Sequence, residues 1–534
     1  MRPLFIILLS TLLNGCYQQA NSLSDTLIYC SQALPQSFNP QLSNNQATLD
    51  ATTNQLFNRL IKVDPNNDEI IAELASDWSI SEDNKSYIFH LRKDVPFQQT
   101  EYFTPTRNFN ADDVLFSFNR LIDIASPFHD INSDQGNYFF NHPFKNLISN
   151  LSKIDEHTIK IELKKPVSAF LTYLAAHYAV IHSQEYASSL LSSNQPSRMD
   201  YYPVGTGPYQ FKNSNGSGVI RFDSNPLYWG KTPAIKHVIF DTTKNNSKRF
   251  AKLLSGECDI MTNPAPSQLR HISLNKSITV SNRPTNNLSL LAFNSTKKTL
   301  SNSHIRKALA YAIDQNTIVD SVFFDSATSA KGLLLKQSWA FDRNSAHFFY
   351  DPELAQQLLK ENSFDFKQTL TMLVPTVESA LNPNFNKTAE FIASNLRSIG
   401  VQVDIIALNN DALTTRLITG NYDTYLAAVN INSYDPDTIF NSLLSCDVSI
   451  LEGNSSQWCN NKTQKLLESA LLAENSNLRK LYYYQLQQII NQEQPYYPLA
   501  HAHRVDIFNN NVTGLTVNPL TGINFQYVTK SEAK

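Results

Sequence analysis

Hydrophobic and polar residues follow two different periods along this chain of 534 residues. Alternation at every second position, bounded by turn-forming residues, predicts strands, at residues 25–30, 154–166, 288–294, 369–375, 401–408 and 422–429, and a hairpin at residues 76–97 with its tip at 82–84. Apolar residues three and four positions apart predict helices, at residues 48–61, 110–121, 303–314, 354–359, 388–399 and 477–491.

The order of these elements indicates the fold class. Strands alternate with helices in the second half of the chain, which is typical of an α/β protein with a mixed or parallel sheet. The chain is too long for one hydrophobic core, so two or three domains are expected. Residues 203–209, with two glycines and two prolines, and residues 282–287 are the predicted crossings between domains.

Composition excludes some classes of function. The hydrophobic fraction of 42% is typical of a globular protein, and the formal net charge is −3. No run of Lys or Arg is long enough to follow a phosphate backbone, so nucleic acid is not an expected partner. No P-loop, His-Glu-x-x-His or Gly-x-Ser-x-Gly motif is present, and we predict neither enzymatic activity nor a cofactor.

Residues 1–16 predict export. Arg2 precedes a short apolar run from Leu4 to Leu13, which is too short to span a bilayer as a mature helix. The sequence Leu13-Asn14-Gly15-Cys16 is similar to a bacterial lipobox, which would make Cys16 the lipid-bearing first residue of the mature protein. The alternative is ordinary cleavage nearby without a lipid, and export is expected in either case.

Four cysteines remain after Cys16: Cys30, Cys258, Cys446 and Cys459. An even number in an exported protein predicts two disulfides, for which three connectivities are possible. Closeness in the sequence favours Cys446 with Cys459, which leaves Cys30 with Cys258. A zinc site is the alternative, but the close cysteine pairs of zinc modules are missing.

The stretch from Tyr422 to Cys459 is the candidate ligand wall. A strand leads into a polar cluster containing Asp435-Pro436-Asp437, and the cluster is followed by the disulfide loop. Asp435 and Asp437 are either paired acids or half of a calcium site, or they accept hydrogen bonds from nearby backbone N–H groups in a proline-containing turn; we favour the turn.

His501 and His503 lie two positions apart on a predicted strand and therefore face the same side. A pair of histidines on one face is one way to bind a metal or haem, but residues of this kind are more often ordinary histidines at the rim of a cavity. We favour that second interpretation, and we predict no metal site.

Many short phrases match one family in number and order. They are IYCSQALPQSFNPQL, LASDWSIS, FHLRKDVPF, FTPTRNFNADDVLFSFNR, VGTGPYQF, NPLYWG, LAFN, IRKALAYAID, YDPELAQQLL and DPDTIFNSLLSC. With them the chain resembles the bacterial extracellular solute-binding proteins of family 5, the dipeptide- and oligopeptide-binding group. Three further phrases look most like the Sap-type proteins linked to antimicrobial-peptide transport: LLLKQSWAFD, MLVPTVESALNPN and TAEFIASNLRSIGVQV.

The resemblance implies a type II periplasmic binding protein-like fold, with two lobes that close on a ligand and an extra domain. By analogy, a signal peptide at 1–16 precedes a discontinuous domain I at 17–55, 207–284 and 503–534. Domain II then comprises residues 56–206, and domain III comprises residues 285–502. The family's disulfide pairing corresponds to Cys30 with Cys258 and Cys446 with Cys459.

The resemblance also places the ligand contacts. Dipeptide binders of the family hold the peptide amine with an Asp, and Asn432 stands at that position. They hold the peptide carboxylate with an Arg, and Ser379 stands there, followed by Leu381 at an aromatic position. Both charged contacts are therefore missing, and a neutral amide lacks the Coulomb attraction that selects a charged terminus. The other expected ligand-binding residues are Asn44, Asn45 and Tyr434.

The resemblance implies a monomeric, exported binding protein in the periplasm of a Gram-negative bacterium, with a lipid anchor if Cys16 is modified. It would capture a peptide, or a related amphipathic ligand such as haem, and deliver it to an inner-membrane ABC permease. The expected ligand is a longer peptide or one with uncharged ends. The alternative function is a surface lipoprotein that uses the same scaffold for adhesion or chaperone-like binding without transport.

Overall fold

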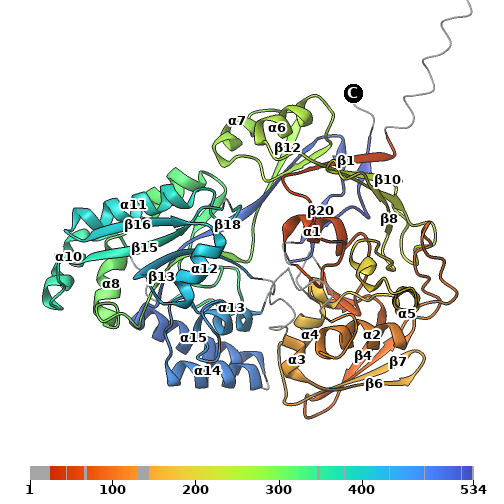
Figure 1. Cartoon of the computed structure of the whole chain (residues 1–534), viewed down its shortest axis with the longest axis horizontal. Helices are drawn as coiled ribbons and strands as arrows, with labels where there is room; N and C mark the ends of the chain where they lie inside the picture. The colour runs from red at the N-terminus through yellow and green to blue at the C-terminus, as the bar shows by residue number, and fades with distance from the viewer. Residues whose placement is uncertain are drawn as a thin grey trace, which may run out of the picture.

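Strand β18 (Tyr496–Asn509) runs through the middle of the molecule and belongs to both of its halves (Figure 1). Its first residues pair with β13 (Asn287–Phe293), and its last residues pair with β12 (Ile278–Pro284) and β11 (Ile260–Thr262). One sheet of 12 strands therefore continues from one half into the other.

This computed structural model describes residues 24–43, 45–64, 69–129, 143–344, 349–377, 379–431, 433, 435–473, 475–518 and 520–531. The proposed signal peptide and Cys16 lie outside these residues. No helix among the described residues is both long enough and apolar enough to cross a membrane.

Units I and II form one half of the molecule, and unit III forms the other (Figure 1). Unit I contains both ends of the described chain. Strand β1 (Thr26–Ser31) lies between β10 (His237–Thr242) and β11 and is parallel to both, with Leu27 and Tyr29 fully buried. Its other elements are α1 (Gln46–Thr52), β8 (Tyr209–Ser214), β9 (Val219–Ser224), α6 (Asn246–Leu254), α7 (Leu269–Ile272), β19 (Val512–Thr513), β20 (Thr516–Asn518), β21 (Gly522–Asn524) and β22 (Thr529–Lys530).

Unit II is built on an antiparallel sheet of four strands in the order β4-β5-β7-β6. The predicted hairpin is confirmed, because β4 (Ala75–Ile80) and β5 (Ser86–Leu91) pair and Asn84 turns between them with a φ of 54°. The other elements are β2 (Ile61–Val63), β3 (Ile70–Ala72), α2 (Ala111–Ile122), α3 (Pro143–Leu147), β6 (Ile148–Asp155), β7 (Thr158–Leu163), α4 (Phe170–Leu174) and α5 (Gln184–Ser192).

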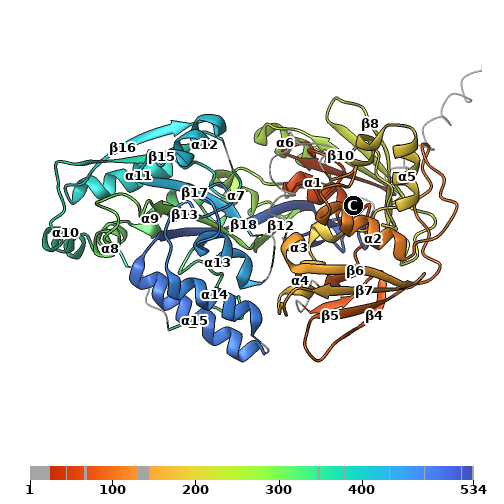
Figure 2. The same ribbon diagram turned by 60° about the horizontal axis from the view of Figure 1, so that its bottom comes forward.

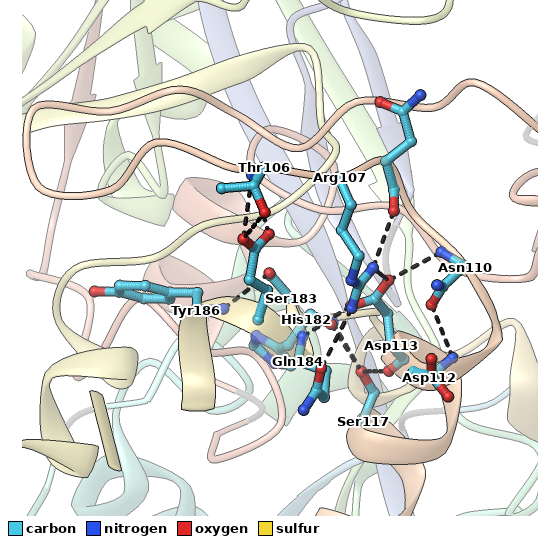
Figure 3. A network of polar contacts seen from close by, with 12 residues as sticks. Thr106, Arg107, Asn110, Asp112, Asp113, Ser117, His182, Ser183, Gln184 and Tyr186 are labelled. Carbon is cyan, nitrogen blue, oxygen red and sulfur yellow. Dashed lines mark hydrogen bonds and ion pairs between the residues drawn. The ribbon is translucent and has the colours of Figure 1, made fainter. Parts of the chain in front are cut away.

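A polar network in unit II joins α2 to α5 (Figure 3). The buried Asp113 carboxylate accepts hydrogen bonds from the backbone N–H groups of Asn110 (2.9 Å) and Gln184 (2.8 Å) and forms a two-bond ion pair with Arg107. Burial raises the pKa of Asp113, and Arg107 opposes that rise. Both oxygens of the Asp113 carboxylate are used within the protein, so this ion pair positions helices and is not a candidate ligand site.

Unit III has the predicted βαβ arrangement. Strand β15 (Thr369–Pro375) is parallel to β16 (Gln402–Leu408), and α11 (Phe385–Ser398) connects them. The other elements are α8 (Ser303–Tyr311), α9 (Gln315–Ile318), β14 (Ala327–Ser329), α10 (Pro352–Glu361), α12 (Asn410–Ile418), β17 (Thr424–Asn430), α13 (Pro436–Leu444), α14 (Asn461–Leu472) and α15 (Ser476–Glu493).

One predicted helix is wrong in its extent. The helix expected over residues 48–61 ends at Thr52, and Leu56 and Leu60 are buried in an irregular segment before β2. Gln55 explains the change, because its side-chain amide donates to the carbonyl of Ile523 at 2.6 Å and ties this segment to the C-terminal strands. Tertiary packing therefore replaces the helical pattern here.

The buried side chains fall into separate clusters that follow the units. One cluster gathers residues between Leu60 and Val204, and two others gather residues between Leu288 and Ala502. A fourth cluster combines Phe57 and Val180 with residues of unit I, and the proposed domain ranges remain a prediction.

Both predicted disulfides are present. Cys30 on β1 is bonded to Cys258, and Cys446 after α13 is bonded to Cys459. These four cysteines are therefore not zinc ligands.

The two disulfides are expected to differ in their effect on stability. Cys30 and Cys258 are 228 residues apart and Cys446 and Cys459 are 13 apart, so the first bridge restricts the unfolded chain more. Replacing Cys30 and Cys258 by Ser should lower the free energy of unfolding by about 2 kcal/mol more than replacing Cys446 and Cys459. Urea unfolding followed by circular dichroism measures the difference. An equal or larger loss for the short loop would contradict it.

Candidate functional site

A cavity lies where the three units meet. Its volume is about 10 Å³, which is room for about one water molecule, and it is lined from unit II by Val63, Thr172, Ala175 and Ala176, from unit III by Ser433, and from unit I by Asn518, Leu520 and Thr521. In this arrangement the space is too small for a peptide, but its position among the three units is where lobe closure would bury a ligand, and such sites are often found at domain interfaces.

Two other cavities lie within unit III. One, between β18 and α15, has a volume of about 30 Å³, and the other, beside Thr376 and Asn384, has a volume of about 220 Å³. Neither reaches units I or II with its lining residues, so neither has the geometry of a site closed by two lobes.

Hydrogen bonds on both sides of Ser433 fix the chain after β17 where it reaches the cavity among the three units. The Ile431 N–H donates to the carbonyl of Asn286 at 2.9 Å, and the side chain of Asn286 donates to the carbonyl of Ser433. The Ser433 hydroxyl then accepts a hydrogen bond from the Asp435 N–H at 3.0 Å. Asn432 and Tyr434, which flank Ser433 in the sequence, lie outside the described residues, so their roles in ligand binding remain predictions.

The Asp435-Pro436-Asp437 stretch begins a helix. Asp435 is the N-cap of α13, its carboxylate accepts a hydrogen bond from the Asp437 N–H at 2.9 Å, and Pro436 occupies the first turn. The predicted capping role of Asp435 is therefore confirmed, whereas the helix after it was not predicted. Within the described residues no three His, Cys, Asp or Glu side chains are grouped as metal ligands.

Arg479 holds Asp435 from the opposite side. Its guanidinium forms two hydrogen bonds of 2.6 Å to the Asp435 carboxylate, its Nε donates to the carbonyl of Ala470, and it lies 5.5 Å from the Trp339 ring centroid and 5.4 Å from that of Tyr483. Burial lowers the pKa of Arg479, but the contacts with Asp435 outweigh burial and raise it. The guanidinium is therefore a permanent, buried cation.

Ser379 lies in a turn of unit III. Its hydroxyl accepts a hydrogen bond from the Leu381 N–H at 3.1 Å, and its carbonyl accepts one from the Asn382 N–H at 3.2 Å. Asn382 is fully buried and donates to the Ser289 hydroxyl on β13 at 3.1 Å. The turn is thus anchored to the central sheet, and the half-buried Ser379 supplies a neutral hydroxyl there.

Asn45 has a structural role in unit I. Its side chain accepts a hydrogen bond from the Ala47 N–H at 2.9 Å and caps α1. Asn44 lies outside the described residues. Ligand contacts by either residue therefore remain predictions.

His501 and His503 lie on β18 in the crossing between the two halves. The Nδ1 of His501 is hydrogen-bonded to the carbonyl of Asn287, and that of His503 to the side chain of Asn282. Burial lowers the pKa of His501 to about 4, so its imidazole is neutral at pH 7. One nitrogen of each ring is thus bound to the strand next to it, which gives both side chains a structural role, whereas the buried Nε2 of each ring has no hydrogen-bond partner among the described residues.

Three side chains of this region were not found from the sequence. Arg479 and Tyr483 are four apart on α15 and so share one face, but nothing in that spacing identifies Asp435 as their partner. Tyr173 on α4 donates a hydrogen bond to the Asp437 carboxylate at 2.7 Å and joins unit II to unit III, and no local pattern indicates this contact.

Comparison with known proteins identifies the class. Residues 69–449 match the family model described as bacterial extracellular solute-binding proteins, family 5. The chain belongs to this family, as the resemblance implied, and its α/β fold with closing lobes is that of a type II periplasmic binding protein.

Particular relatives cover nearly the whole chain. The probable ABC transporter periplasmic-binding protein SapA of Escherichia coli is 35% identical over 93% of this chain and 91% of its own length. The dipeptide-binding protein of Pseudoalteromonas sp. SM9913, solved with Met-Leu, is 37% identical, covers 95% of this chain and 100% of its own, and has a TM-score of 0.84. DppA of Helicobacter pylori, solved with the peptide STSA, is 28% identical, covers 95% of this chain and 98% of its own, and has a TM-score of 0.82.

Replacement of Arg479 by Met should destabilise the protein strongly. It leaves the buried Asp435 and Asp437 carboxylates without their guanidinium, and loss of one partner of a buried pair costs about 3–5 kcal/mol. Thermal and urea unfolding measure the loss, and adding Asp435→Asn should recover part of it. Lys212→Met, which removes an exposed ion pair with Glu101, is the control and should leave the unfolding midpoint unchanged. Equal stabilities of Arg479→Met and the control would contradict this account.

Proposed function

We propose that this protein is the exported substrate-binding component of a peptide-type ABC importer. It works in the periplasm of a Gram-negative bacterium as a monomer, captures a peptide between its lobes and presents the closed, loaded form to an inner-membrane permease. The observation that supports this most directly is the full-length similarity to a dipeptide-binding protein solved with Met-Leu, at 37% identity and a TM-score of 0.84.

The proposed class of ligand is inferred from the charges of the residues at the expected contact positions. Asn432 and Ser379 offer an amide and a hydroxyl where the family's dipeptide binders offer a carboxylate and a guanidinium. Neither group attracts an ammonium or a carboxylate by charge in a pocket that excludes water. The proposed ligand is therefore a peptide whose charged ends lie outside the cavity or are absent, bound through its main-chain groups.

A peptide longer than two residues has its charged ends further apart than a dipeptide. Each residue of an extended chain adds about 3.3 Å, so the termini of a tetrapeptide or longer ligand lie well beyond the positions that hold a dipeptide. The similarity to the Helicobacter pylori protein solved with STSA fits a ligand of this length.

Attachment to a membrane depends on Cys16 in this proposal. Cleavage before Cys16 and lipid modification of its thiol would tether the protein while leaving both lobes in the aqueous compartment. Neither the adhesion nor the chaperone-like alternative receives support from the relatives, which are named for transport or for binding.

Binding of free dipeptides should be weak. Isothermal titration calorimetry with Met-Leu should give a heat too small to fit, whereas acetylated and amidated tetra-alanine should bind measurably, because its uncharged ends require no Coulomb partner. Tight binding of Met-Leu that disappears when its amine is acetylated would contradict the proposal.

A variant that restores the missing charges tests the same proposal, because it should strengthen dipeptide binding. Asn432→Asp combined with Ser379→Arg restores both charges and should strengthen Met-Leu binding by about tenfold or more, as expected for charge-assisted hydrogen bonds. Asn410→Asp, which adds a negative charge at an exposed position of α12, is the control and should have no effect.

A further inference from the structure

The two halves touch at a second place besides β18. Helix α4 of unit II and the start of α13 of unit III lie on facing sides of the two halves (Figure 2). There the Tyr173 hydroxyl donates a hydrogen bond of 2.7 Å to the Asp437 carboxylate. Both residues are at least nine-tenths buried, with 5% and 4% of their surfaces exposed. This contact exists only while the two halves are together.

A neighbouring contact also joins unit II to unit III. The Ser168 N–H and hydroxyl of unit II donate to the carbonyl of Leu471 at 3.2 and 3.0 Å, at the end of α14 in unit III. The Leu471 side chain packs against the core of unit II. Together the two contacts connect residues 168–173 with the ends of α13 and α14.

The unit III side of both contacts is held rigid by one side chain. Arg479 binds the Asp435 carboxylate two residues before Asp437, and its Nε donates to the carbonyl of Ala470, next to Leu471. The acceptors that face unit II are thereby fixed before the halves meet. A preformed acceptor loses less conformational entropy when the contact forms, so more of the hydrogen-bond energy stabilises the closed arrangement.

We propose that Tyr173 and Asp437 form a latch that stabilises the closed form of the protein without contacting the ligand, and that at acidic pH closure is accompanied by uptake of a proton at Asp437. This goes beyond the proposed function, because it concerns the opening equilibrium of the empty protein whichever ligand it binds. In a two-state equilibrium such a latch also sets ligand affinity, because it sets the fraction of molecules already closed.

The surroundings of Asp437 determine the direction of the proton linkage. The charged and titratable groups around it are Asp435 at the start of its own helix, Arg479 and Tyr483 on α15, and Lys165 and Tyr173 from unit II. Burial raises the pKa of Asp437 to about 6, the negative charge of Asp435 adds to that rise, and Tyr173, Arg479 and Lys165 oppose it. Separation of the halves exposes Asp437 to water, which returns its pKa towards the ordinary value of about 3.9.

The direction in which closure depends on pH follows from this difference between the two pKa values of Asp437. The closed form has the higher pKa, so it binds more protons than the open form between about pH 4 and pH 6. Closure is therefore favoured as the pH falls, and this extra stabilisation is lost as the pH rises through about 6. A shift from about 3.9 to about 6 predicts that the closed-to-open ratio is about tenfold higher at pH 5 than at pH 7.5.

Small-angle X-ray scattering of the ligand-free protein tests the latch. Tyr173→Phe removes the donor and keeps the ring, and it should shift the closed-to-open ratio about tenfold to a hundredfold towards open, the expected effect of a hydrogen bond to a charged group. The radius of gyration at pH 7.5 should therefore increase. Tyr102→Phe is the matched control, because it removes a hydrogen bond of 2.6 Å to Pro203 that lies within one half. Equal radii for Tyr173→Phe and the wild type would overturn the latch.

A second variant tests whether closure is linked to proton uptake at Asp437. Asp437→Asn keeps an oxygen that accepts from Tyr173 but cannot titrate, so its radius of gyration should be the same at pH 5 and pH 7.5. The wild type should be more compact at pH 5. A wild-type radius that does not change between these pH values, or a change that persists in Asp437→Asn, would overturn the proton linkage. Circular dichroism of each variant confirms that it is folded, and neither outcome depends on which ligand the protein binds.

Discussion

The hydrogen bonding of β18 in both halves is the constraint on which the rest of the structure depends. Tyr496 to Ala500 pair with β13 in unit III, and His503 to Asn509 pair with β12 beside unit I. Between these two ladders, the buried Asn287 side chain accepts from the Ala502 N–H and donates to the Ala502 carbonyl, both at 2.8 Å. The Asn287 side chain thus satisfies backbone groups that no neighbouring strand reaches, while β14 pairs with residues 500–502 of the same stretch. This crossing connects the two halves, and motion of the halves opens and closes the cavity among the three units.

Local patterns in the sequence were sufficient for most of the fold. The strands of unit III and α11 alternate in the order expected of a βαβ unit, and both disulfides join the predicted cysteines. These features depend on residues close in sequence, or on a small number of cysteines. The helix expected through Leu60 was wrong because Gln55 bonds to Ile523, which is 468 residues away. An apolar spacing of three and four indicates a buried face, but it does not say whether distant backbone groups will compete for that segment.

The candidate site was less predictable for the same reason. Asp435 was assigned a capping role from its place before Pro436, and that role is local. Its ion pair with Arg479 spans 44 residues, and the Tyr173–Asp437 contact spans 264. Contacts of this kind depend on how whole units pack, which no periodicity in a single sequence encodes. Buried ionic networks contribute little net stability compared with apolar packing, but they restrict the geometry of the groups they include. Here the Arg479 network fixes the surface of unit III that meets unit II.

The proposed ligand is a peptide that the closed lobes hold without binding charged termini. Native mass spectrometry of protein purified from its producing cells, followed by release and fragmentation of the bound mass, tests this most directly. The account predicts peptides longer than two residues, or peptides with blocked ends. Recovery of dipeptides with a free amine and a free carboxylate as the main ligand would contradict it.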